Sequence, residues 1–148
     1  MNRRELLKMT TLFGLMASSG LITQAQANEW EKQAFEGKSL DDVVKALGGG
    51  GTEKSSGVNL TAPDIAENGA VVPIVIATTL KASQMAIIVE KNPTALSGIF
   101  YFPEGAEPFV STRVKMAQTS NVYALVKADQ KWYIASKEVK VTLGGCGG

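Results

Sequence analysis

The heptapeptide VSTRVKM, residues 110–116, alternates apolar and polar side chains with a period of two residues. Because successive side chains of a β-strand point to opposite faces, this period gives a strand one largely apolar face. The residues on that face are Val110, Thr112, Val114 and Met116. A strand of this kind has one face on a core and the other in water, which is typical of antiparallel sheets.

The same period recurs in KEVKVTL, residues 137–143, where Val139, Val141 and Leu143 share one face and Lys140 lies on the other. The patterning starts at Val58 and continues through further runs. The runs expected to be strands are 71–79, 85–91, 96–102, 109–116, 120–127 and 131–143. Short strands at this spacing predict a mainly β chain, with an immunoglobulin-like antiparallel β-sandwich over residues 58–143.

The segment before the sandwich, residues 28–57, reads as a helical segment followed by a glycine-rich linker. Apolar residues recur at helical spacing over residues 29–47, and Ser39 with Asp42 resembles a capping box. Four glycines, residues 48–51, are expected to end the helix and to begin a loop that runs to Ser56. A phosphate-binding loop is the alternative, but no Gly-Lys-Ser/Thr sequence follows these glycines.

Residues 1–27 have the features of a cleavable export signal. Arg3, Arg4 and Lys8 precede a moderately apolar stretch, and Ala25-Gln26-Ala27 is an A-x-A cleavage site. The paired arginines resemble a twin-arginine signal, so we expect a periplasmic protein. A membrane anchor is the alternative, but the apolar stretch is short and ends at a cleavage site, so no anchoring is expected after cleavage.

Composition excludes several classes of function. The net charge of +1 gives no field that would favour nucleic acid. The chain has no histidine and one cysteine, which excludes histidine-dependent nucleophilic catalysis and the usual zinc sites. The carboxylates form no convincing acid–base pair. We therefore expect neither an autonomous enzyme nor a bound cofactor or metal.

The single cysteine, Cys146, lies in the sequence GGCGG, residues 144–148. Gly144, Gly145, Gly147 and Gly148 offer little side-chain area to hold the segment down, and glycine costs the most backbone entropy to order. We therefore expect a slim, flexible arm that carries the thiol about 10 Å beyond Leu143. No cation close in sequence activates the thiol, so the activating groups would come from other proteins. This pattern favours a carrier that other enzymes act upon.

Four aromatic residues gather around a proline-containing turn: Phe100, Tyr101, Phe102 and Phe109. They could close one end of the core, or some of them could form an apolar docking patch.

Four stretches of this chain carry a resemblance: GGCGG, the preceding KEVKVTL, LTAPDIAENGAVVPIVI (60–76) and STRVKMAQTSNVYALVK (111–127). They resemble the SoxY family, the sulfur carriers of the periplasmic sulfur-oxidising (Sox) pathway. The resemblance implies that Cys146 is the covalent attachment point for sulfur intermediates, as an S-thiosulfonate and then a persulfide. The glycines 144, 145, 147 and 148 would be the carrier arm, with no cofactor other than the bound sulfur.

The resemblance also implies the partners. They are SoxZ, which would form a tight heterodimer with this chain, a SoxXA-type c-type cytochrome, a SoxB-type hydrolase and, where present, a SoxCD-type sulfur dehydrogenase. Two alternatives remain. One is a structural or adhesive β-sandwich that uses Cys146 for an intermolecular disulfide. The other is a cytosolic ubiquitin-like carrier ending in Gly-Gly, against which the export signal and the cysteine argue.

Overall fold

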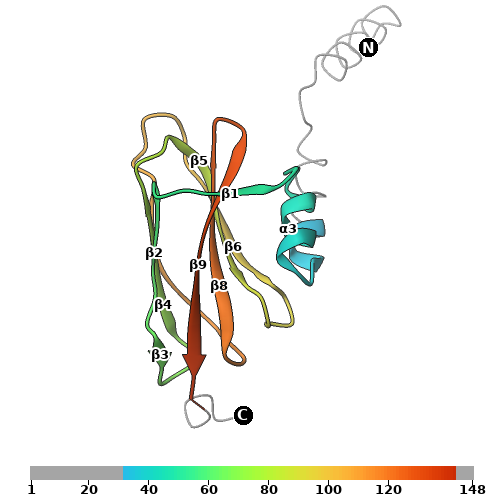
Figure 1. The fold of residues 1–148 in the computed structure, drawn as a ribbon, viewed down its shortest axis with the longest axis vertical. Coiled ribbons are helices and arrows are strands. Elements are labelled where there is room, and N and C mark those ends of the chain that lie inside the picture. Colours follow the sequence, from blue (N-terminus) through green and yellow to red (C-terminus); the bar gives the residue numbers. More distant parts are fainter. Residues whose placement is uncertain (1–31, 143–148) are drawn as a thin grey trace, which may run out of the picture.

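The computed structural model describes residues 32–142, in which two β-sheets face each other (Figure 1). The larger sheet has the strand order β1 (Thr52–Lys54), β9 (Lys131–Val141), β8 (Ser120–Ala128), β5 (Ala82–Val89) and β6 (Leu96–Tyr101), and β3 (Ile65–Ala66) pairs with the far end of β9. The smaller sheet has the order β2 (Val58–Thr61), β4 (Val72–Thr78) and β7 (Phe109–Val114). The predicted immunoglobulin-like β-sandwich is confirmed.

The alternation in residues 110–116 places its apolar face in the core between the sheets. Val110, Val114 and Met116 are buried, whereas Ser111 and Arg113 are exposed. The buried residues belong to a hydrophobic cluster to which both sheets contribute, including Ile74 and Ile76 of β4, Met85 and Ile87 of β5, and Val122 and Val139. The period of two in the sequence therefore reports correctly which face of β7 is buried.

Two short strands depart from the antiparallel expectation. β1 and β3 both pair with β9 in parallel, at opposite ends of that strand. The loop expected from Gly48 to Ser56 is therefore wrong at Thr52–Lys54. Residues 62–70, which have the composition of a loop, contain β3. These strands have three and two residues, so their own side chains carry too little alternation to predict them.

The helix expected over residues 29–47 is divided in the part that is described. Residues 32–36 form one helical segment and α3 (Leu40–Ala46) forms the next. Ser39 has an extended backbone, and its Oγ accepts a hydrogen bond from the Asp42 amide at 3.2 Å, as the capping pattern predicts. An N-cap residue lies outside the helix that it caps, so Ser39 begins a new helix rather than continuing the first.

The helices cover the face of the larger sheet that points away from the smaller one (Figure 1). Val43 and Val44 of α3 share a second hydrophobic cluster with Ile88, Leu125 and Trp132 of the sheet. β5 and β8 are therefore buried on both faces, and the helical segment is packed against the sandwich.

Gly49 allows the close approach between α3 and β9. A Cβ at this position would lie 2.7 Å from Trp132 Cδ1 and 2.8 Å from Val44 Cγ1. We expect Gly49→Ala to lower the free energy of unfolding by about 1–3 kcal/mol, because the clash overpacks the second cluster. Gly50→Ala is the matched control, since nothing lies within 4 Å of its Cβ position. Urea titration of both variants checks the prediction, and equal midpoints would contradict it.

Candidate functional site

The residues predicted to carry the chemistry, Cys146 and the glycines 144, 145, 147 and 148, lie outside the described residues 32–142. The structure does describe the strand that leads to them. β9 ends at Val141, and Thr142 follows it. The site can therefore be built from the base of the predicted arm.

The carboxyl-terminal end of β9 is held on both of its edges. On one edge, β3 pairs with it in parallel, and the amides of Lys140 and Thr142 donate to the carbonyl oxygens of Asp64 (3.0 Å) and Ala66 (3.2 Å). On the other edge, the Val141 amide donates to Thr119 Oγ1 at 2.9 Å. Successive amides therefore have partners on alternate sides up to Thr142.

Side chains add to this attachment. The Thr142 hydroxyl donates to the Glu67 carbonyl oxygen at 3.3 Å, and Lys137 Nζ donates to the Ala62 carbonyl oxygen at 2.5 Å. Lys137 Nζ also lies 2.9 Å from an Asp64 carboxylate oxygen, but the Asp64 side chain is 90% exposed. Because exposed ion pairs contribute little, the backbone hydrogen bonds carry most of the attachment.

The core supports the same end of the strand from beneath. Val139, Ala66 and Met116 are buried, and Val141 packs against their cluster. The Met116 amide donates to the Gly69 carbonyl oxygen at 2.6 Å, which ties the loop after β3 to the end of β7. The arrangement fixes the position and direction in which the chain leaves the sandwich.

No local pattern in the sequence predicted this base. The segment APDIAENGA, residues 62–70, has the composition of a loop, so its sequence does not predict the two residues of β3. Nothing in the local sequence indicates that Thr119 accepts a hydrogen bond from β9. Only the pairing with a strand distant in the sequence makes these residues part of the site.

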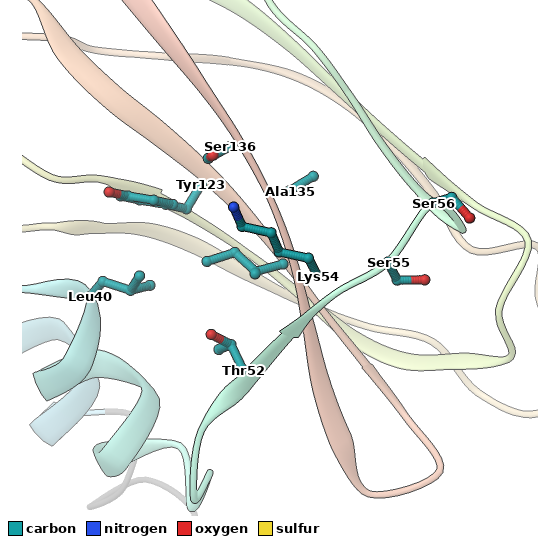
Figure 2. Close-up of a pocket in the computed structure, with 9 residues that line it drawn as sticks. Leu40, Thr52, Lys54, Ser55, Ser56, Tyr123, Ala135 and Ser136 are labelled. Atoms are coloured by element: carbon teal, nitrogen blue, oxygen red, sulfur yellow. The ribbon is translucent and has the colours of Figure 1, made fainter.

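A hollow of about 690 Å³ lies beside β9 at the point where β1 leaves it (Figure 2). Its lining residues are Leu40, Thr52, Lys54, Ser55, Ser56, Tyr123, Ile134, Ala135 and Ser136. Burial raises the pKa of Tyr123, and the nearby Glu90 carboxylate, which accepts a 3.3 Å hydrogen bond from the Tyr123 hydroxyl, raises it further.

This hollow lies beyond the reach of the chain's own thiol. Ala135 is seven residues before Thr142 on the extended strand β9, which corresponds to about 23 Å. The four steps from Thr142 to Cys146 span at most about 14 Å. The thiol of the same chain therefore cannot reach Ala135, and the hollow is separate from the attachment site predicted at Cys146.

The four aromatic residues around the proline-containing turn differ in burial, which bears on whether they close the core or form an exposed patch. Phe100 and Phe102 pack against the core, whereas Tyr101 and Phe109 are 55% and 53% exposed. They line an open groove of about 560 Å³ between β6 and β7, which are edge strands of the two sheets. Cross-strand pairing links Tyr101 through Gln84 and Lys127 to Trp132, which lies near the start of β9. The groove therefore lies at the opposite end of the sandwich from the carboxyl-terminal end of β9.

Residues 32–142 hold no group of three or more metal-ligating side chains. The helices in this range also lack the length and hydropathy that a transmembrane span requires.

Comparison with known proteins gives a family match and a fold match. Residues 44–146 match the family described as "Sulfur oxidation protein SoxY". The structure of the sulfur carrier protein SoxY from Chlorobium limicola f thiosulfatophilum is similar, with 37% identity and a TM-score of 0.62, over 71% of this chain and 97% of that one. No curated protein matches the chain significantly.

Superoxide reductases share the fold alone. A superoxide reductase (neelaredoxin) from Ignicoccus hospitalis is 19% identical with a TM-score of 0.51, over 66% of this chain and 87% of that one. A putative superoxide reductase from Thermotoga maritima is 18% identical with a TM-score of 0.50, over 57% and 85% of the two chains.

Proposed function

Because the chain belongs to the SoxY family of sulfur oxidation proteins, we propose that it is a sulfur carrier that holds thiosulfate-derived intermediates on the Cys146 thiol. The observation that carries this proposal is the extent of the family match, which runs from residue 44 to residue 146 and so ends on the only cysteine. The attachment of β9 up to Thr142 supports it, since a carrier needs a fixed base from which to present its thiol.

In the first step, the Cys146 thiolate and thiosulfate form a sulfur–sulfur bond and give up two electrons, which a SoxXA-type c-type cytochrome would accept. In the second, a SoxB-type hydrolase adds one water to the terminal sulfonate group and breaks its bond to the adjacent sulfur. Sulfate and two protons leave, and a persulfide stays on Cys146. A SoxCD-type sulfur dehydrogenase, where present, oxidises that persulfide further. This chain supplies the thiol and its presentation, and the partners supply the catalytic groups.

We also propose that the chain works in the periplasm as a heterodimer with SoxZ. The twin-arginine features of residues 1–27 support export of a folded complex.

The test is to incubate the purified heterodimer with thiosulfate and the cytochrome and to measure the intact mass of this chain. We expect a gain of one thiosulfate-derived group that a reductant removes, and peptide mapping should place it on Cys146. A chain that instead occurs entirely as a disulfide-linked dimer in fresh extracts, with no adduct, would favour the structural alternative.

The slim arm itself gives a further prediction. We expect Gly145→Phe to lower the rate of enzymatic loading about 10- to 100-fold, because a bulky ring beside the thiol misplaces it in a narrow channel. The rate at which iodoacetamide alkylates Cys146 should stay unchanged, since a small reagent needs no channel. An equal slowing of both reactions would show that the ring acts on the thiol itself.

A further inference from the structure

The short distance between Cys146 and the sandwich limits how an enzyme can approach the thiol. Thr142 is held by its amide and its hydroxyl, and four peptide steps separate it from Cys146. These steps span at most about 14 Å. An enzyme whose reacting group lies inside a channel must therefore bring the mouth of that channel against the surface around Thr142.

Two of the exposed large hydrophobic side chains lie on segments that surround this exit. Ile65 is 57% exposed and sits on β3, opposite Lys140 of β9. Val71 is 50% exposed and ends the turn in which its amide donates to the Asn68 carbonyl oxygen at 3.3 Å. That turn leads from β3 to the start of β4, and Figure 1 shows β3 at the end of the sandwich where β9 terminates.

The segment between these two residues carries little charge. Glu67 is its only ionisable residue, and Glu67, Asn68 and Ala70 are all exposed. Exposed charges border the segment, since Asp64 precedes Ile65 and Lys140 pairs with it. The surface around the exit thus combines two exposed apolar residues with charged neighbours. Transient protein contacts use limited areas of this kind.

Single exposed apolar side chains are common and need no explanation on their own. The positions of Ile65 and Val71 are the reason for assigning them a role. The same β3–β9 ladder that fixes the base of the arm fixes Ile65 beside it, so any protein that holds Cys146 in a channel must meet this surface.

We propose that Ile65, Val71 and Thr142 form a docking collar that contacts the channel mouth of each enzyme that takes Cys146 into its active site. This inference rests on the proposed carrier function and adds the surface through which the enzymes recognise the carrier. Because these enzymes need the same collar, they bind the carrier one at a time.

The test compares Ile65→Lys and Val71→Lys with wild type, each in the heterodimer, as substrates of the thiosulfate-conjugating cytochrome. We expect kcat/KM for loading to fall about 10-fold, mainly through KM, since a buried charge opposes docking. Alkylation of Cys146 by iodoacetamide and the melting temperature should stay unchanged. Phe35→Lys is the matched control, because Phe35 is 41% exposed but lies on the helical segment, and it should load normally.

A second measurement tests the limit that reach imposes. Four glycines inserted between Gly144 and Gly145 lengthen the arm by about 14 Å. With this longer arm the channel mouth no longer has to touch the collar, so the loss caused by Ile65→Lys should shrink to less than about 2-fold. If wild type and both lysine variants load equally well, the docking collar is refuted and the carrier function is not. A wild-type chain that acquires no sulfur group would overturn the carrier function itself.

Discussion

Replacing Cys146 by serine is expected to abolish every covalent sulfur adduct on this chain and to stop sulfate formation from thiosulfate in cells that depend on it. A serine oxygen cannot form the sulfur–sulfur bond on which the proposed cycle begins. The chain has one cysteine, so no second thiol can replace it. Intact mass after incubation with thiosulfate and the cytochrome measures the first effect, and sulfate release by the mutant strain measures the second.

The fold should be unaffected by this substitution, because serine is close to cysteine in size and the hydrogen bonds described for the end of β9 join residues within 62–142. Urea unfolding of the serine variant serves as the control and should match wild type. Sulfate release at the wild-type rate by the serine strain would refute the proposal that Cys146 is the attachment point.

Trp132→Ala is expected to lower the free energy of unfolding by about 3–5 kcal/mol. Trp132 is 2% exposed, near the start of β9, and belongs to the cluster beneath α3 with Val43 and Val44. Truncation leaves a cavity between the helix and the larger sheet, and small domains have only about 5–15 kcal/mol of stability in all. Urea denaturation followed by far-ultraviolet circular dichroism measures the loss.

Trp132→Phe is the matched control, since it keeps an aromatic ring in the same cluster and should cost much less than the alanine variant. Phe35→Ala adds a second comparison at an exposed ring and should leave the midpoint close to wild type. If Trp132→Ala unfolds at the same urea concentration as wild type, the second cluster contributes little to stability.

The sandwich was predictable because most of its strands bury one face or both. The runs at 71–79, 96–102, 109–116, 120–127 and 131–143 coincide within about two residues with β4 and β6–β9. The run at 85–91 missed the first three residues of β5, where Ala82, Ser83 and Gln84 show no apolar alternation and the pairing with β8 shifts register. The sequence also indicates the break in the helical region, because Ser39 and Asp42 form a capping pattern that marks the start of a helix.

The remaining features depend on pairing between distant segments. β1 and β3 are too short to show a period, and each exists because β9 offers it an open edge. Cys146, the only thiol, stays a prediction from composition and resemblance, because it lies outside the described residues. The hydrogen bonds at the end of β9 could not be predicted, because no local pattern links Asp64 and Ala66 to Lys140 and Thr142.

The placement of β9 also has a mechanical consequence. This strand extends over Lys131–Val141 and is paired with β8 over most of its length, with β1 near its start and with β3 at its end. Tension applied to the arm acts along the strand, at right angles to the antiparallel ladder bonds with β8 and obliquely to the slanted parallel bonds. The bonds are then loaded together in shear and do not open one after another, so the sandwich should resist a pull on the carboxyl-terminal end of β9.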